Sequence, residues 1–349
     1  RAAGLHAPPR FCRAPPLLPR PPASAAPRRR SPVSGGRAVA VPRIVGVVGR
    51  RHRHNEPKSG GNRQAKIAAR AAEREELSVE PRPFAGFAGE CDMVAMREFV
   101  PSATTRLATP GDGRDITLAT VLPGAIAGLV RDELLGGEAL VGLQVQVHGP
   151  DPAADLAYAV DWASRAGGGE TLTSSHPSDS TPALADVVVA DAPLEIAVHP
   201  DFSWWLADGA QVSPEIAQAI KNANEVMMPS ARVTADGIEA AWWVDAGEKA
   251  HIRWVRPEDE DALFEALARV HAAGGLHLGE GSRFAGSFRT HGLLVPVFDL
   301  DPEMHHQEWA PGLQELDARL GEALAQEGPL GSDERASRDG LRARQVTLR

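Results

Sequence analysis

The stretch AHIRWVRPEDEDALFEALARVHAAGG, residues 250–275, contains a strand pattern directly followed by a helix pattern. In its first part the apolar Ile252 and Trp254 alternate with His251 and Arg253, and such period-two alternation is typical of a half-buried strand. After the proline, four consecutive acidic residues fill the first helical turn, where the helix dipole favours negative charge. Two glycines then end the helix. The stretch therefore predicts a strand followed by a helix that begins at a proline.

The same two patterns recur along the chain. Strand patterns occur at residues 116–122, 140–147, 194–198, 238–244, 283–289 and 293–300, and further helices start at Asp151-Pro152 and Ser213-Pro214. Because alternating, half-buried strands are typical of antiparallel sheets, we predict an α+β fold with mostly antiparallel sheets and Pro-capped helices. Residues 116–166 and 238–275 each fit a β-hairpin followed by a Pro-capped helix. We therefore consider two similar strand-strand-helix halves, although the residue identities do not repeat.

Charge divides the chain unevenly. Residues 1–82 carry 18 basic and five acidic side chains, a net charge of +13, whereas residues 83–349 carry 19 basic and 41 acidic ones, a net charge of −22. The Pro/Arg-rich residues 1–57 have no apolar periodicity, so we expect them to be disordered. Their composition resembles a transit peptide, but we favour translation upstream of the true start in a GC-rich gene. For residues 58–82 we expect a basic, solvated helix or linker.

The remainder is long enough to bury a sizeable core. The small, polar stretch at 167–182 is the best internal boundary, so we predict a first α+β half at 83–170 and a second at 183–325. A charged C-terminal tail at 326–349 would follow. No run of 18 apolar residues occurs, which excludes a membrane-spanning helix by sequence, and we expect a cytoplasmic protein.

Five stretches are distinctive enough to indicate a family. They are RPFAGFAGECDMVAMREFVPSATT (82–105), DAPLEIAVHPDFSWWL (191–206), HIRWVRPEDEDALFEALARVHAAG (251–274), GSRFAGSFRTHGLLVPVFDL (281–300) and ARQVTLR (343–349). Together they resemble an uncharacterised actinobacterial family that is classed as a domain of unknown function. The resemblance covers roughly residues 60–349, and it implies no established activity and no catalytic residues. Members of that family often bear the names topoisomerase II or preprotein translocase SecA.

Those two inherited names require chemistry that this sequence lacks. Both activities need a nucleotide site, yet the chain has no G-x-x-x-x-G-K-[ST] loop and only four lysines. The sole tyrosine, Tyr158, lies mid-helix among apolar residues, where packing rather than nucleophilic attack is expected. Cys12 and Cys91 are 79 residues apart, so they cannot form a disulfide framework or a thiolate-rich zinc site.

A group of five basic residues is the strongest candidate site. If residues 250–255 and 283–289 pair as strands, alternation places three arginines and two histidines on one face of an otherwise acidic body. These residues are His251, Arg253, Arg283, Arg289 and His291. Guanidinium groups bind phosphate and carboxylate bidentately, so the group would suit an anionic ligand. The alternative, which we rank ahead, is that these side chains pair with acids such as Glu239, Glu280, Asp299 and Asp301 on a solvated face.

Other candidates are weaker. Glu195, His199 and Asp201 could form an acid–base group, but a wet sheet face explains them equally well. The paired tryptophans favour core packing over ligand stacking. His305 and His306 are adjacent, so we expect their rings to point apart, and we expect no metal site and no cofactor.

The sequence establishes no activity. We expect a binding or interaction module. An enzyme or binder acting on an anionic small molecule is the first alternative. Association with nucleic acid or the ribosome through the basic residues 50–74 is the second. The partner and the oligomeric state do not follow from the sequence.

Overall fold

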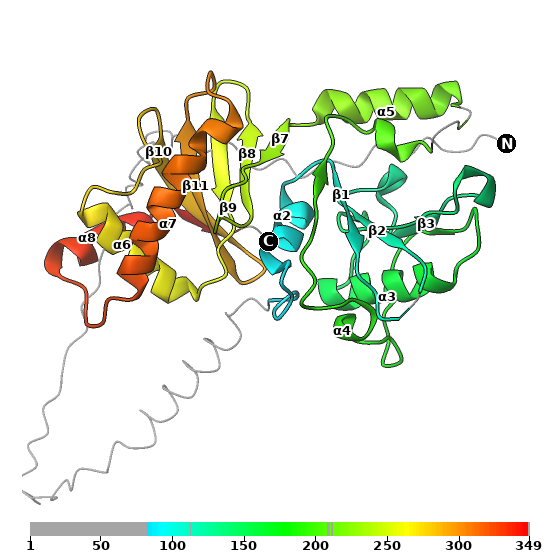
Figure 1. Ribbon diagram of the computed structural model, residues 1–349, viewed down its shortest axis with the longest axis horizontal. Coiled ribbons are helices and arrows are strands. Elements are labelled where there is room, and N and C mark those ends of the chain that lie inside the picture. Colours follow the sequence, from blue (N-terminus) through cyan, green and yellow to red (C-terminus); the bar gives the residue numbers. More distant parts are fainter. Residues whose placement is uncertain (1–81, 112, 208–209, 211, 348–349) are drawn as a thin grey trace, which may run out of the picture. The chain divides into compact units, whose positions relative to one another are not determined.

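The computed structural model describes residues 82–349 except 112, 208–209, 211 and 348–349 (Figure 1). The predictions for residues 1–57, for residues 58–81 and for the basic residues 50–74 lie outside the described residues. The described part contains two mostly antiparallel sheets with helices and strands mixed along the chain. The predicted α+β fold is therefore confirmed.

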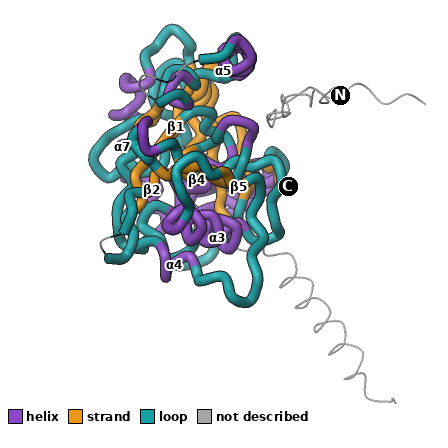
Figure 2. The backbone as a smooth tube through the Cα atoms, turned by 90° about the vertical axis from the view of Figure 1, so that its right-hand side faces the viewer, coloured by secondary structure: helices purple, strands orange, loops and turns teal. Residues whose placement is uncertain are grey.

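The first sheet has the strand order β5-β3-β4-β2-β1-β6. Its strands are β1 (Ala103–Leu107), β2 (Ile116–Ala119), β3 (Gly128–Val130), β4 (Ala139–Gly142), β5 (Thr171–Leu172) and β6 (Ala197–Val198). Its helices are α2 (Glu90–Glu98), η1 (Pro123–Ala125), η2 (Glu133–Leu135), α3 (Pro152–Arg165) and α4 (Leu184–Val187). The Asp151 side chain caps α3 by accepting hydrogen bonds from two backbone N–H groups, and Pro152 occupies its first turn. Figure 2 shows α3 alongside β4.

The second sheet has the order β12-β10-β11-β9-β8-β7. Its strands are β7 (Ser230–Arg232), β8 (Ala241–Asp245), β9 (Ala250–Trp254), β10 (Arg283–Thr290), β11 (Leu293–Leu300) and β12 (Gln345–Thr347). The remaining helices are η3 (Ser203–Trp205), α5 (Pro214–Val226), α6 (Glu260–Ala272), η4 (His306–Trp309), α7 (Ala310–Leu324) and α8 (Ser332–Arg342). Of these, η3 and α5 pack on Val121 and Ala125, which follow β2 of the first sheet. Figure 1 shows α6, α7 and α8 grouped beside the second sheet.

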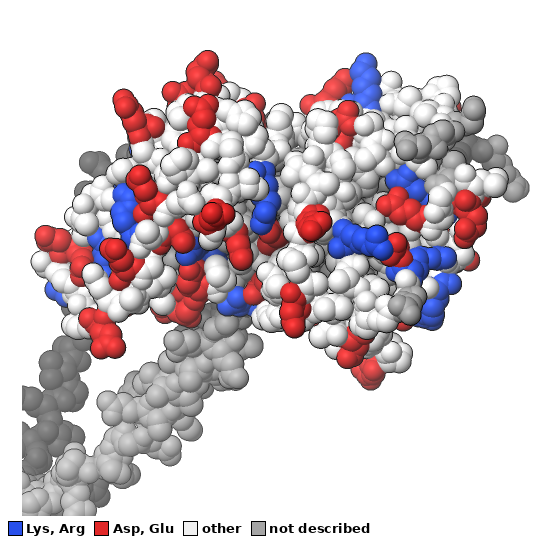
Figure 3. All heavy atoms as spheres, in the orientation of Figure 1, with Lys and Arg blue, Asp and Glu red and all other residues white. Residues whose placement is uncertain are grey.

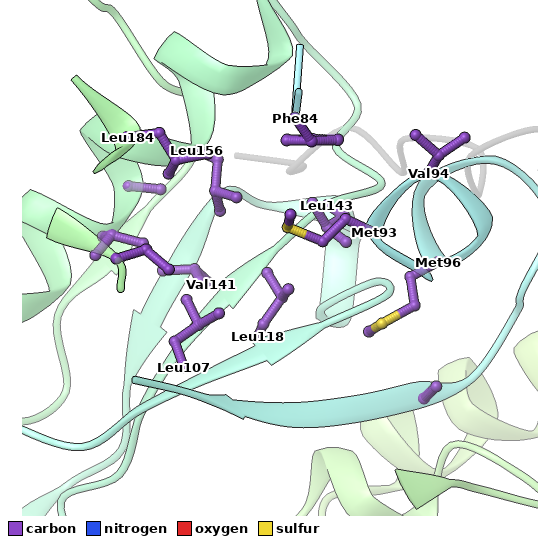
Figure 4. Close-up of a cluster of buried hydrophobic side chains, with 14 of the residues drawn as sticks. Phe84, Met93, Val94, Met96, Leu107, Leu118, Val141, Leu143, Leu156 and Leu184 are labelled. Atoms are coloured by element: carbon purple, nitrogen blue, oxygen red, sulfur yellow. The ribbon is translucent and has the colours of Figure 1, made fainter. Parts of the chain in front are cut away.

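Two large cores hold these elements together. In one core, the face of the second sheet that carries Ile252 and Phe298 packs against Leu263, Leu267 and Leu316 of α6 and α7. The other core surrounds α2, whose residues from Cys91 to Met96 are all buried. Figure 4 shows methionines and leucines of that core pointing toward one another, and the same cluster includes Trp242 and Val295 of the second sheet. Thus α2 contacts both sheets.

The structure corrects the predicted hairpin in residues 116–166. β2 and β4 pair in parallel, and β4 lies between β2 and β3. The strand predicted at 140–147 ends at Gly142, and beyond it the Gln144 side chain donates hydrogen bonds of 2.6 and 2.7 Å to the carbonyls of Met96 and Val100 near the end of α2. The hairpin of β8 and β9 is confirmed. Since only the second unit is a hairpin, the two units are not alike.

Two further boundaries differ from expectation. The helix expected at Pro257 begins at Glu260, because the Asp259 side chain caps it by accepting two backbone N–H groups. The sequence of residues 333–344 predicts a short charged helix, and the structure confirms it as α8, but the segment is more than a tail: α8 packs on α6 and buries Leu341, and β12 pairs in parallel with β10. The division into halves at 83–170 and 183–325 stays a prediction.

Candidate functional site

A β-bulge in β10 decides where its arginines lie. Arg283 pairs with Asp299, but the register shifts after Phe284, and Gly286 then pairs with Val297. The extra residue moves every later side chain of β10 to the other face of the sheet. The prediction that Arg283 and Arg289 share one face is therefore wrong.

The structure separates two of the five predicted residues from the rest. Arg289 lies on the helix side of the sheet, where it pairs with the Glu260 carboxylate at 2.6 Å. His291 lies in the turn between β10 and β11, with its Nε2 atom 2.7 Å from Glu98 Oε1 of α2. Both side chains have carboxylate partners, and neither joins a common pocket.

The other three predicted residues lie on the opposite face of the sheet. His251 and Arg283 flank Asp299, because the register places Asp299 across from both. Asp299 Oδ2 accepts a 2.7 Å hydrogen bond from Arg283 and a 2.8 Å hydrogen bond from Lys249. His251 Nδ1 lies 3.2 Å from Asp299 Oδ1 but is not directed for a hydrogen bond. The fifth residue, Arg253, follows His251 by two positions on the same face.

We call this set the basic row: Lys249, His251, Arg253, Arg283 and Asp299. Sequence reasoning missed Lys249, although it has the same strand parity as His251 and Arg253. The row combines three permanent cations with one carboxylate, in a body whose net charge is −22. Figure 3 shows acidic side chains spread over the visible face of the described residues, with basic ones interspersed. The excess positive charge of the row is thus a local feature.

Neighbouring groups perturb the proton affinities in the row. Burial lowers the pKa of His251, and the positive charge of Arg253 adds to this effect, while Asp299 opposes it. The imidazole is therefore mostly neutral at pH 7. Burial by itself would raise the pKa of Asp299, but the hydrogen bonds from Lys249 and Arg283 outweigh it and lower the pKa. Asp299 is accordingly ionised and already paired.

Arg253 is the exceptional member. Arg253 is 9% exposed. Burial lowers the pKa of its guanidinium to about 10, and no carboxylate among the described residues offsets that effect. Among the described residues it has no hydrogen-bond or ion-pair partner. The one electrostatic contact of its guanidinium within the described residues is a cation–π contact, in which Cζ lies 5.4 Å from the Phe99 ring centroid. A guanidinium stays protonated even at this pKa, so a mostly buried side chain carries an uncompensated positive charge, while its nitrogens keep some contact with solvent.

Arg256 shows how this protein otherwise buries an arginine. Arg256 is 8% exposed, and it pairs with both Glu258 and Asp317 while its Cζ lies 4.3 Å from the Trp254 ring centroid. Its pKa is raised, because these two carboxylates outweigh the effect of burial. Two arginines of one segment are thus equally buried, but only Arg256 has counter-charges.

The outer end of the basic row opens to the surface. A shallow depression of about 260 Å³ lies there, and its lining includes Lys249, Arg283 and Asp299. The Arg283 side chain is 74% exposed. The row therefore runs from an exposed pair of cations to a buried one.

The other candidates have structural roles. His199 stacks on Trp204, with ring centroids 5.3 Å apart, and its Nε2 lies 2.8 Å from Thr104 Oγ1, while Glu195 is exposed. The Trp204 and Trp205 indoles donate to Ser102 Oγ and the Val121 carbonyl, respectively. These contacts fit packing, as do the buried side chains of Trp242, Trp254 and Trp309.

His305 and His306 do not point apart as expected, because their ring centroids are 4.0 Å apart. Within the described part of the chain, no group of three or more His, Cys, Asp and Glu side chains is arranged to hold a metal ion. In the same part, no helix has the length and apolar character needed to cross a membrane.

The fold and the basic row together define an α+β protein with an uncompensated arginine buried beside an open cationic edge. The chain belongs to DUF5926, a family of unknown function, whose family model matches residues 83–349. The resemblance drawn from the sequence is therefore confirmed. A search of curated proteins and a search of solved structures each found no match.

Proposed function

We propose that this protein is a binding module for a small anionic ligand and that Arg253 is the anchor for its carboxylate or phosphate group. One observation carries the proposal: Arg253 is only 9% exposed as a residue, and its guanidinium has no hydrogen-bond or ion-pair partner among the described residues. A buried charge without a partner destabilises a folded protein by several kcal/mol. A bound anion would supply the missing charge and accept hydrogen bonds from the guanidinium fork.

The surrounding charge favours a small ligand. Salt screens charges over about 8–10 Å, so an anion at Arg253 is attracted mainly by the row, whereas a long polyanion would also meet the acidic body. His251 is neutral at pH 7 and can donate or accept one hydrogen bond. The proposal includes a cytoplasmic location, which the free, buried Cys91 suits. An actinobacterial origin remains a prediction.

Thermal unfolding of the full chain tests the proposal, with inorganic phosphate and benzoate as probes at low ionic strength. Ligands that bind only the folded state raise the melting temperature in proportion to the logarithm of their excess over Kd. We expect both the wild type and Arg106→Met to be stabilised by at least one probe. Arg106 is a suitable control, because it pairs with Asp115 at an exposed position of the first sheet.

Arg253→Met should abolish that stabilisation, and Arg253→Lys should weaken it, because an ammonium lacks the bidentate fork. The proposal fails if neither probe stabilises the wild type. It also fails if Arg253→Met responds as strongly as Arg106→Met.

A further inference from the structure

The second cationic group of the basic row has unused hydrogen-bond donors. Asp299 is the only carboxylate that Lys249 and Arg283 contact among the described residues. Arg283 reaches it through one nitrogen, Nη2, and Lys249 through its single Nζ. A guanidinium has five N–H groups and an ammonium has three, so most of these donors remain free. Two cations with one carboxylate also leave a local charge of +1.

The spacing between this outer pair and Arg253 is set by the sheet. Arg283 of β10 pairs with Asp299 of β11, and Asp299 pairs in turn with His251 of β9. Arg283 therefore lies two strands away from His251, which precedes Arg253 by two residues. With strands about 4.8 Å apart and about 3.3 Å per residue, the two arginine α-carbons are separated by about 12 Å. Lys249, four residues before Arg253, is about 13 Å away by the same rise.

The interval between the two cationic ends contains no unpaired charge, because its one ionised group, Asp299, is hydrogen-bonded to Lys249 and Arg283. His251 is neutral at pH 7, and Val297, which pairs with Arg253 across the strands, is apolar. A compact ion at Arg253 could not reach the outer pair. A ligand that satisfies both ends therefore needs two anionic groups joined by an uncharged spacer.

Resting on the proposed function, we propose that the ligand is an elongated dianion. Its inner carboxylate or phosphate would bind Arg253, and its outer one would bind Lys249 and Arg283 at the mouth of the row. His251 would face the spacer. The outer group would compete with Asp299 for the same two cations.

Titration calorimetry of the full chain with a ladder of linear dicarboxylates tests this inference. The probes are malonate, glutarate, pimelate and azelate, each compared with a monocarboxylate of equal chain length. We expect the longer dicarboxylates to bind about threefold to fivefold more tightly than their monocarboxylate counterparts, the gain typical of an exposed ion pair. Malonate, which is too short to span the row, should gain nothing.

Two variants separate the ends of the site. Lys249→Met combined with Arg283→Met should abolish the preference for dicarboxylates, so that the longer dicarboxylates bind this double variant no more tightly than their monocarboxylate counterparts do. Asp299→Asn should strengthen dicarboxylate binding, because it removes the competing carboxylate while retaining both cations. Arg106→Met serves again as the unaffected control.

The outcomes distinguish this inference from the proposed function. If monocarboxylates bind through Arg253 but dicarboxylates of every length bind no better, the dianion inference is wrong and the proposed function stands. The same conclusion follows if the double variant keeps the preference. If neither a carboxylate nor phosphate binds the wild type, or if Arg253→Met binds the same anions normally, the proposed function itself is wrong. If phosphate binds but no carboxylate does, only the dianion inference is wrong.

Discussion

Replacing Arg253 by methionine should stabilise the ligand-free protein. This expectation is opposite to the usual effect of a core substitution, since most of these destabilise by about 1 kcal/mol or more. It follows because Arg253 is 9% exposed as a residue and no carboxylate of the described residues lies beside its guanidinium. Methionine has a similar length, is flexible and fills the same space without a charge.

The pKa indicates the size of the effect. Burial lowers the pKa of Arg253 from 12.5 to about 10, and a tenfold change in proton affinity corresponds to about 1.4 kcal/mol. Keeping the charge in the folded protein therefore costs roughly 3 kcal/mol at neutral pH. Methionine would lose the cation–π contact with Phe99, which contributes about 1 kcal/mol. The net expectation is a stabilisation of about 2 kcal/mol, or a melting temperature about 4–8 °C higher.

Urea unfolding of the full chain, in a buffer free of phosphate and carboxylates, measures this difference. Arg256→Met provides the matched contrast. Because Glu258 and Asp317 would lose their counter-charge, that variant should be destabilised by about 2–4 kcal/mol. The two substitutions remove chemically identical groups of equal burial, yet the expected signs are opposite.

A clear loss of stability in Arg253→Met would refute the reasoning. It would mean that the guanidinium stabilises the native state by itself, and that the anchor for an anion has been misidentified. Equal destabilisation by both variants would lead to the same conclusion.

Three further predictions follow from local geometry. In Gly286→Ala the new Cβ would lie 2.9 Å from the Arg344 carbonyl oxygen, at a backbone φ of +152°. We expect the free energy of unfolding to fall by about 1–3 kcal/mol and the amide protons of β12 to exchange faster. Unchanged exchange in β12 would contradict this prediction. Burial lowers the pKa of His251 below 6.5, so the unfolded chain binds more protons at this residue than the folded chain does. The free energy of unfolding therefore falls as the pH drops from 6.5 through the lowered pKa. In urea titrations at several pH values, His251→Gln should make that decline shallower. Burial raises the pKa of Cys91 to about 12, so its thiol is protonated and unreactive in the folded protein at pH 8. In a Cys12→Ser variant, a disulfide reagent at pH 8 should therefore modify Cys91 only after the protein unfolds. Rapid modification of the folded protein would contradict this prediction.

Local sequence signals predicted much of the secondary structure. Asp151-Pro152 and Ser213-Pro214 mark the starts of α3 and α5, because capping and first-turn proline act within one helical turn. In α5 the sequence pattern places Ile216, Ile220, Ala223 and Met227 on one face, but only Ala223 is buried and Ile216 is 45% exposed. A helical period shows which residues share a face, but not whether another element covers that face.

The candidate site was predicted in part for the same reason. Strand parity correctly placed His251 and Arg253 together, since both belong to one uninterrupted strand. Parity failed for Arg289, because a single extra residue after Phe284 reverses every later side chain of β10. The one local signal for that bulge is Gly286, because an isolated glycine within a strand pattern often marks a bulge.

By itself, the sequence determined the α+β class, the family and the acidic character of the folded part, because propensity, periodicity and charge are properties of neighbouring residues. Only the tertiary structure decided which charges meet. Arg253 and Arg256 are nearly adjacent in the chain and equally buried, yet contacts with distant segments give Asp317 to one of them and the Phe99 ring to the other. Whether a buried charge has a partner depends on these long-range contacts, and in this protein that difference identifies the candidate site.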